Sequence, residues 1–266
     1  MRGGRELSGR ICIGGSKNAT LPILAACLLT SEQVILHNLA EVTDTAVMLD
    51  ILAALGCTVS EDTVTAAQVK TNVPEDLARR MRASIVLLGP LLARTGEVRL
   101  PKPGGDDIGD RRVEQHIGGL RRMGAEIEET QTEIIGQARR LHGARIVLDM
   151  PPVTGTENLM MAATLADGRN EIINAAREPH VQDLAKLLNA LGANVIGAGT
   201  QEIVVQGVVE LHGGEHTVIS DYLEAGTYAM AVAAAGGAVH LECSPPDALP
   251  MRLLKPADAR VAIGRG

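Results

Sequence analysis

The sequence predicts an α/β fold built from repeated units. Short apolar strands alternate with helical segments along the 266-residue chain, which is the pattern of the α/β class. Three of the helical segments carry apolar residues at i, i+3, i+4 and i+7 and end in a glycine followed by a small residue. These glycines, Gly56, Gly124 and Gly192, lie 68 residues apart. A period this regular indicates internal duplication.

Each repeat follows the same plan: an apolar helix, a strand, a connection, and a second helix before the turn glycine. The repeats are expected over residues 18–59, 82–127 and 155–195. Two connecting strands are expected as well, a buried one over residues 145–149 and another over residues 202–206.

The third apolar helix has a start signal of its own. Thr154-Gly155-Thr156-Glu157 has the pattern of a capping box, in which Thr154 is the N-cap and Glu157 the N3 residue. The helix is expected from Asn158 onward.

A fourth repeat begins but is not completed. Gly226 opens an Ala-rich helix to Ala235, and a strand is expected over residues 238–243. Pro250 and Pro256 stand where the second helix should follow, and proline costs about 3 kcal/mol inside a helix. We expect this unit to expose apolar strand surface and to promote self-association.

The composition predicts an aliphatic core and argues against nucleic acid as a partner. Hydrophobic residues make up 45% of the chain, which has no Phe or Trp and two Tyr. A net charge of −7 without a basic run provides no basic surface that would bind a phosphate backbone. The shortage of aromatic residues leaves few side chains on which bases could stack.

Residues 19–29 need a separate explanation, because an apolar stretch after several arginines resembles a signal segment. The repeat accounts for the same residues as a core helix, so we do not expect export. No other apolar run is long enough to cross a bilayer. We expect a cytoplasmic protein with no membrane contact.

Cysteine and histidine spacing favours neither a metal site nor a disulfide framework. Cys12, Cys27, Cys57 and Cys243 are far apart in the sequence and form no C-x-x-C pair, and the histidines are scattered except for His212 and His216, which are separated by Gly-Gly-Glu. Reduced thiols are therefore expected. We expect no metal and no cofactor.

The segment Pro103-Gly104-Gly105-Asp106-Asp107 is the strongest candidate for chemistry. It joins a predicted strand over residues 97–100 to a predicted helix over residues 113–123, and Pro-Gly-Gly cannot hold a regular element. The middle repeat has four more residues between strand and turn glycine than its siblings, and they fall in this loop. An insertion that the scaffold does not need favours function. The alternative is a solvated turn with surface charges.

Motifs in the same order along nearly the whole chain resemble the enolpyruvyltransferase family. Within it they fit the UDP-N-acetylglucosamine 1-carboxyvinyltransferases, because Lys17 is followed by Asn18 where the 5-enolpyruvylshikimate-3-phosphate synthases typically have Lys-Ser. The resemblance extends to about Pro246. The motifs that carry it are Gly14-Gly15-Ser16-Lys17-Asn18-Ala19, Met81-Arg82-Ala83-Ser84, Pro103-Gly104-Gly105, Ile108-Gly109, Arg111, His116, the run from Gly155 to Ala163, the run from Asn174 to Pro179, and Glu224-Ala225-Gly226-Thr227.

The resemblance implies a fold of two similar lobes, each an inside-out α/β barrel of three repeated units with helices inside and sheets outside. Residues 13–220 would form the first lobe, and residues 1–12 and 221–266 a fragment of a truncated second lobe. The implied reaction transfers the enolpyruvyl group of phosphoenolpyruvate to the 3′-hydroxyl of UDP-N-acetylglucosamine and releases phosphate. That is the first committed step of peptidoglycan precursor synthesis.

The resemblance also implies the residues that bind these substrates. Lys17, with Asn18 beside it, matches a lysine that binds phosphoenolpyruvate, and an ammonium group is a compact charge suited to phosphate. Arg82 and Arg111 match arginines near the substrates, since a guanidinium group binds phosphate through two hydrogen bonds. The implied nucleotide-sugar contacts are Arg111, Arg112, Val113, Glu114 and Gln115 in one strip, and Pro151, Pro152, Val153 and Thr154 in a second strip that could equally be a strand end and helix cap.

Three positions depart from the family pattern. Asp106 stands where most members carry the cysteine that acts as general acid and is alkylated by the epoxide antibiotic fosfomycin, although some members carry Asp. Arg112 replaces a usual proline, and Tyr222 a usual arginine. Asp106 is the implied catalytic acid, and it can deliver a proton only if its environment raises its pKa above the ordinary value near 4.

Three functions stay open at this point. The chain could be an enolpyruvyltransferase whose opposite wall and general base come from a second lobe. It could instead be a truncated or degenerate relative that binds the nucleotide sugar without turnover, or a folded fragment without function.

Overall fold

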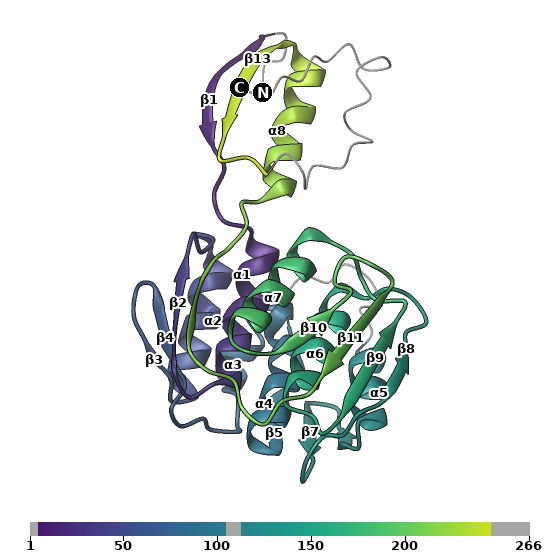
Figure 1. Ribbon diagram of the computed structural model, residues 1–266. Helices are drawn as coiled ribbons and strands as arrows, with labels where there is room; N and C mark the ends of the chain where they lie inside the picture. The colour runs from purple at the N-terminus through teal and green to yellow at the C-terminus, as the bar shows by residue number, and fades with distance from the viewer. Residues whose placement is uncertain (1–4, 105–112, 246–266) are drawn as a thin grey trace.

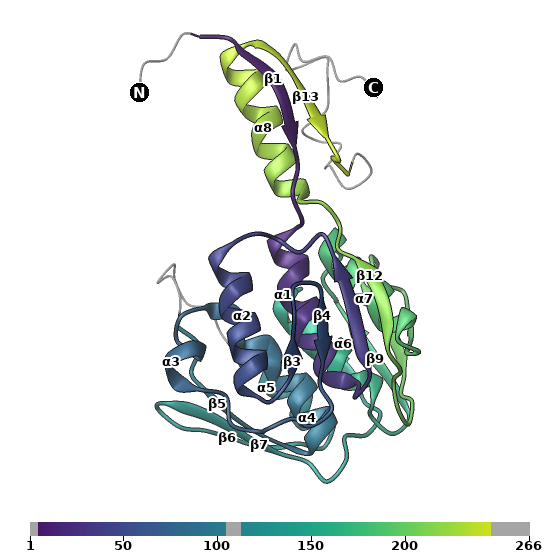
Figure 2. The same cartoon turned by 90° about the vertical axis from the view of Figure 1, so that its left-hand side faces the viewer.

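The computed structural model describes residues 5–104 and 113–245 of the chain. They form a large lobe with a smaller unit attached at one end (Figure 1). In the lobe, helices occupy the middle and sheets lie around them, as both views show (Figures 1 and 2). This arrangement is the predicted inside-out α/β lobe of three repeated units.

The three units of the lobe have the same order of elements. The first comprises α1 (Lys17–Ala26), the 3-10 helix η1 (Cys27–Leu29), β2 (Gln33–His37), α2 (Thr43–Ala54), β3 (Thr58–Val59) and β4 (Thr63–Thr65). The second comprises the 3-10 helix η2 (Arg82–Leu87), α4 (Leu88–Thr95), β5 (Glu97–Pro101), α5 (Glu114–Arg122), β6 (Glu126–Glu129) and β7 (Glu133–Gln137). The third comprises α6 (Val153–Thr164), β9 (Arg169–Ile173), α7 (Pro179–Ala190), β10 (Asn194–Ile196) and β11 (Glu202–Gln206).

Shorter elements connect the units, and three elements form the smaller unit. The connecting elements are α3 (Glu75–Ala78), β8 (Arg145–Val147) and β12 (Gly214–Thr217). The smaller unit comprises β1 (Leu7–Cys12), α8 (Tyr222–Ala235) and β13 (Gly237–Glu242).

The sheets repeat one design. Their strand orders are β12-β2-β4-β3, β10-β11-β9-β8 and β5-β7-β6. In the first two, an antiparallel group is extended by one parallel connecting strand, with Gly214 opposite Val34 and Arg145 opposite Glu171. In the third, a single parallel bridge from Asn72 to Arg99 takes that place. The smaller unit keeps only the parallel pair, β1 beside β13.

The turn glycines adopt the backbone conformation that the repeat requires. Gly56, Gly124 and Gly192 have φ angles of +100°, +92° and +97°. Residues with a Cβ rarely adopt this region, so a glycine follows α2, α5 and α7, the second helix of each unit. The predicted 68-residue repeat is thereby confirmed.

The core lies between the inner helices and consists of aliphatic side chains. Every residue of α1 from Ala19 to Ala26 is buried, and so is every residue of α6 from Gly155 to Thr164. The apolar stretch that resembled a signal segment is therefore a core helix. A helix that is buried all round in this way belongs at the centre of a lobe.

The predicted capping box at the third apolar helix is wrong. The helix α6 begins at Val153, so Thr154 lies inside its first turn and no side chain caps it. Glu157 is 1% exposed and does not reach back to the helix start. Pro152 supplies the extended N-cap backbone instead, and the Thr154 hydroxyl is engaged elsewhere.

Two other local predictions need adjustment. The strand expected over residues 145–149 is a half-buried edge strand, because β8 ends at Val147 and alternates between exposed and buried side chains. The helix of the fourth unit begins at Tyr222, earlier than expected, because the Asp221 side chain caps it by accepting bonds from Leu223 N and Glu224 N. The place of its second helix lies outside the described residues.

Candidate active site

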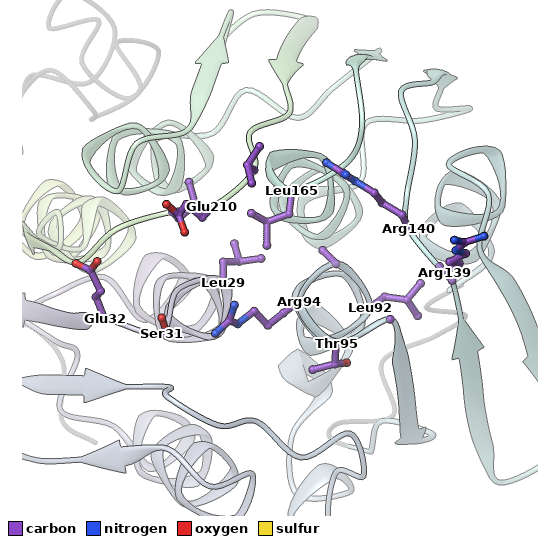
Figure 3. Close-up of a pocket in the computed structure, with 15 residues that line it drawn as sticks. Leu29, Ser31, Glu32, Leu92, Arg94, Thr95, Arg139, Arg140, Leu165 and Glu210 are labelled. Atoms are coloured by element: carbon purple, nitrogen blue, oxygen red, sulfur yellow. The ribbon is translucent and has the colours of Figure 1, made fainter.

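The inner helices of the lobe are α1, η2 with α4, and α6, and the N-terminal end of α1 adjoins the smaller unit through the bond from Lys17 N to Asp221. The C-terminal ends of the inner helices meet around one cavity of about 370 Å³, lined by Leu29 after α1, Leu92 of α4 and Leu165 after α6 (Figure 3). At the far end of the lobe, η2 packs against both α1 and α6, so the N-terminal ends of these elements lie together there. Lys17, Arg82 and Val153 are the first residues of α1, η2 and α6. The structure thus gathers these three predicted residues at one end.

Lys17 is held between the lobe and the smaller unit. Its ammonium Nζ lies 3.0 Å from Asp44 Oδ2, an exposed ion pair. Its backbone N–H donates to Asp221 Oδ2 at 3.3 Å, so the N-cap residue of α8 also contacts the start of α1. Asn18 follows and is half-buried. Asp44 had no sequence signal, since nothing in its spacing relates it to Lys17.

Two chain segments join the lobe to the smaller unit and run side by side. Ser16 N donates to Ile219 O and Asp221 N donates to Gly14 O, each at 2.8 Å. A Cβ at Gly15 would overlap the carbonyl oxygen of Asn38. The Gly14-Gly15 pair therefore lets this doubled connection lie against the end of β2.

A buried histidine joins the two predicted nucleotide-sugar strips. His116 Nδ1 lies 2.9 Å from the Asn158 amide nitrogen, and His116 Nε2 lies 3.3 Å from the Thr154 hydroxyl. An amide nitrogen can only donate, so Nδ1 accepts and Nε2 carries the proton. Nearby, Asp149 N donates to Gln115 Oε1 at 3.1 Å. Segments that are far apart in sequence are thereby fixed beside each other.

The position of His116 also reports on Arg82. Burial lowers the pKa of His116 from 6.5 to about 4, and the positive charge of Arg82 contributes to the shift. His116 is therefore neutral at physiological pH, and the Arg82 charge is close to it. Arg82 is half-buried at the start of η2.

The remaining predicted residues of these strips frame the starts of two helices. Val113 occupies the N-cap position of α5 and Glu114 is its first residue. Pro151 precedes α6, and Pro152 is its N-cap. The first turn of α6 carries no acidic residue, so the positive end of a 12-residue helix is available to an anionic group.

Sequence analysis missed a buried polar cluster beside the connection. It contains Glu157, Glu178, His180 and Tyr222. The Tyr222 hydroxyl lies 3.3 Å from His180 Nδ1, and the two rings stack at 6.0 Å. Within the described residues, Glu157 Oε1, Glu178 Oε2 and His180 Nε2 are buried without a hydrogen-bond partner.

Burial controls the charge of this cluster. It raises the pKa of Glu157 well above 4.5, with a further contribution from Glu178. It also lowers the pKa of His180 below 6.5 and raises that of Tyr222 above 10.0. Tyr222 brings a neutral hydroxyl group close to Glu157, so this residue adds no positive charge that would favour the ionised carboxylate.

A sequence match over nearly the whole chain identifies its family. Residues 1–261 match the family described as EPSP synthase (3-phosphoshikimate 1-carboxyvinyltransferase). The chain belongs to the EPSP synthase family. Members of this enolpyruvyl transferase family transfer the enolpyruvyl group of phosphoenolpyruvate.

Solved structures of enolpyruvyl transferases have the same fold. The enolpyruvyl transferase NikO from Streptomyces tendae is 26% identical with a TM-score of 0.75, and the match covers 87% of this chain and 56% of NikO. An EPSP synthase from Acinetobacter baumannii is 19% identical with a TM-score of 0.73, and the match covers 92% of this chain and 57% of that enzyme. The chain thus spans a little over half the length of these enolpyruvyl transferases.

Three predicted residues of the enolpyruvyl transferase site cannot be placed. Asp106, Arg111 and Arg112 lie outside the described residues. The segment that leads toward them is tightly packed, because a Cβ at Gly104 would overlap the carbonyl oxygen of Arg79. In the described part of the chain, no group of three or more His, Cys, Asp or Glu side chains is placed to hold a metal ion.

The length and apolar character of the described helices decide whether any of them could cross a membrane. None of them combines the length and the apolar character that a bilayer crossing requires.

The stability of this enolpyruvyl transferase lobe should fall with rising pH because of Glu157. Above pH 4.5 the unfolded chain releases the proton that the folded chain retains. The stabilisation is complete below that pH and is lost toward the raised folded pKa, by up to about 1.4 kcal/mol per pH unit. Glu157→Gln cannot ionise, so we expect it to be more stable than the wild type near pH 8. Urea denaturation across pH measures the difference.

The titration of His116 does not affect the comparison of the wild type with Glu157→Gln. His116 has the opposite dependence: its lowered pKa costs stability as the pH falls from 6.5 to about 4. That slope is present in both proteins and cancels from their difference. A constant difference between wild type and Glu157→Gln from pH 4 to pH 8 would contradict a neutral Glu157.

Proposed function

We propose that this chain forms the lobe of an enolpyruvyltransferase that binds phosphoenolpyruvate and the diphosphate of UDP-N-acetylglucosamine. The observation that carries the proposal is the His116 bridge. His116 lies in α5, the helix that begins with the first strip implied to contact the nucleotide sugar. Its Nε2 is 3.3 Å from the hydroxyl of Thr154, which belongs to the second strip. Lys17 and Arg82 lie at the same end of the lobe, so cations and a helix N-terminus face one region.

The proposed chemistry assigns a task to each group. Lys17 and Arg82 neutralise the phosphate and carboxylate of phosphoenolpyruvate, and Arg111 binds the diphosphate of the sugar nucleotide. Asp106 delivers a proton to the methylene carbon, which makes the adjacent carbon electrophilic toward the sugar 3′-hydroxyl. The tetrahedral adduct then loses phosphate and a proton of the new methyl group, which restores the carbon–carbon double bond. A general base must take the hydroxyl proton, and that step typically contributes about 10²–10⁴-fold. The base is assigned to a second lobe.

The acceptor substrate distinguishes the proposed enzyme from EPSP synthase. The family description names 3-phosphoshikimate as the acceptor of EPSP synthase. We favour the nucleotide sugar because Asn18 follows Lys17.

Binding by the isolated chain tests the acceptor and the role of Arg111. Calorimetric titration at low salt should show weak binding of UDP-N-acetylglucosamine and none of 3-phosphoshikimate. Arg111→Ala should weaken binding by about 1.5–3 kcal/mol, the range of a charge-assisted hydrogen bond. Arg122→Ala is the matched control, since Arg122 is exposed in the last turn of α5. Equal affinities of wild type and Arg111→Ala would refute the assignment, and preference for 3-phosphoshikimate would refute the acceptor.

The second candidate function is binding without turnover. The match to just 56–57% of the solved enolpyruvyl transferases favours it for these 266 residues. We expect the chain alone to release phosphate from the two substrates at a rate near background, because closure of two lobes supplies positioning and excludes water. A phosphate-release assay separates the two functions. Robust turnover would place the base within this chain.

A further inference from the structure

Two thiols meet where the first and last described strands lie side by side. Cys12 ends β1 and Cys243 follows β13, and their sulfur atoms are 3.7 Å apart. Both cysteines are exposed free thiols, whereas Cys27 and Cys57 are buried. A disulfide has an S–S bond of about 2.05 Å, so a small movement of the two side chains would bring the sulfur atoms to bonding distance.

The internal repeat shows that Cys243 occupies a special position. Non-glycine residues with positive φ occur at three places in the described chain: Asn38 at +57°, Asn174 at +60° and Cys243 at +56°. Each of them directly follows the strand that comes after the inner helix of its unit: β2 after α1, β9 after α6 and β13 after α8. Asn tolerates this left-handed conformation better than most residues, and two of the units use it.

Backbone hydrogen bonds confirm that the three positions are equivalent. The residue before each one accepts a bond from the neighbouring parallel segment: His37 O from Val218 N at 2.9 Å, Ile173 O from Leu148 N at 3.0 Å, and Glu242 O from Ile13 N at 3.0 Å. The strand pairs β2 with β12, β9 with β8, and β13 with β1 thus end in the same way.

The side chain at this position reaches the parallel neighbour in each unit. Asn38 Nδ2 donates to Val218 O at 2.9 Å, and Asn174 Nδ2 donates to Leu148 O at 3.0 Å. In the smaller unit the amide is replaced by the Cys243 thiol, and its partner is a second thiol, that of Cys12. The bond that fastens the two strands elsewhere is here a pair of groups that can be oxidised.

We propose that Cys12 and Cys243 are a redox modification site that forms a disulfide with a low-molecular-weight disulfide as oxidant. Cys12 donates its S–H toward the Cys243 sulfur, which favours Cys243 as the first nucleophile. The Cys243 thiolate attacks the oxidant, forms a mixed disulfide and releases one thiol. Cys12, after losing its proton, attacks the Cys243 sulfur and releases the second thiol. Two protein thiols are oxidised, and one disulfide is reduced to two thiols.

The surroundings set the order of these two steps. The hydrogen bond to Cys243 raises the pKa of the Cys12 thiol, with further contributions from the charges of Cys243, Glu242 and Glu224. A raised pKa makes Cys12 the poorer first nucleophile, so the first attack is assigned to Cys243 and the resolving step to Cys12.

The bond would fasten the smaller unit at the point where it meets the lobe. Cys12 is followed by Ile13 and the Gly14-Gly15 connection, and Asp221 N donates to Gly14 O there. Without the bond, the β1 and β13 strands are held by their parallel ladder and the Arg10–Glu242 ion pair. Oxidation would join the ends of β1 and β13 covalently and limit how far these two strands can separate.

Oxidation of the purified chain by oxidised glutathione tests the site. The intact mass of the monomer should fall by about 2 Da, the loss of two thiol hydrogens, and proteolysis without reductant should yield a linked pair of peptides that contain Cys12 and Cys243. The oxidised wild type should melt several degrees higher than the reduced one. Reduction with dithiothreitol should reverse both changes.

Two variants keep the test decisive. Cys243→Asn introduces the amide that the sibling units carry at this position, so it should fold, resist the mass change and melt identically with and without oxidant. Cys12→Ser should stop at the mixed disulfide on Cys243. Stable glutathione adducts on both wild-type cysteines, or disulfides between two chains instead of within one, would overturn the proposal.

Discussion

Asn158→Ala is expected to destabilise the lobe by about 3–5 kcal/mol, among the largest effects of a single substitution. Asn158 is fully buried in α6. Its Oδ1 accepts from Gly89 N at 2.6 Å, and its Nδ2 donates to Ile85 O at 3.3 Å and contacts His116 Nδ1 at 2.9 Å. Alanine would leave all three partners buried without this amide, and each unsatisfied buried group costs about 1–3 kcal/mol.

Urea denaturation of Asn158→Ala, followed by circular dichroism, measures the change. Gln182→Ala is the control, because the Gln182 amide also donates to a backbone carbonyl, that of Arg177, but at an exposed place. It should change stability by less than about 1 kcal/mol. Similar losses in the two variants would show that burial of the Asn158 network contributes little.

The network also links stability to the site. His116 holds Thr154 through Nε2 because Asn158 fixes the opposite ring nitrogen. A variant that loosens Asn158 should therefore disturb the contact between the two nucleotide-sugar strips before the lobe unfolds. The proposed site depends on a core amide rather than on surface residues alone.

Sequence reasoning was most successful where a pattern recurs. The helical apolar spacing and the turn glycines depend on local geometry that is the same in every unit, so they predicted the repeats and the core helices. The structure adds that the turn glycines Gly56, Gly124 and Gly192 all have positive φ. The same regularity exposed the insertion in the middle repeat. Because the same pattern occurs in three repeats, each repeat supports the structure predicted for the other two.

Sequence reasoning failed where tertiary contacts override local signals. Thr154 and Glu157 fit a capping box, but the first turn of α6 lies against α5, where His116 takes the Thr154 hydroxyl, and Glu157 is drawn into the core. A local motif cannot show that a neighbouring helix competes for its side chain. Pro152 also allows the helix to begin earlier than the motif implied.

Pairings between distant residues were equally hidden. Asp44 beside Lys17 and Cys12 beside Cys243 result from strand and helix placement, and nothing in their spacing announces either contact. The scattered cysteines predicted reduced thiols without revealing that two of them meet. For Asp106, Arg111 and Arg112 the sequence and its family resemblance remain the whole argument.

Asp106 predicts the response to fosfomycin, with an effect that is nearly all or none. The epoxide alkylates a thiolate, whereas a carboxylate is a far poorer nucleophile. We expect no covalent adduct at position 106 of the wild-type chain. Asp106→Cys should acquire one, because it restores the thiol that most relatives of the resembled enzyme carry there.

Intact mass spectrometry followed by peptide mapping distinguishes the two proteins after incubation with fosfomycin. The chain has four other cysteines, so the wild type reports any background reaction at exposed Cys12 and Cys243, and only the adduct mapped to position 106 counts. An adduct on wild-type Asp106 would show a carboxylate activated well beyond its ordinary reactivity, and the assignment of that residue as a simple proton donor would fail.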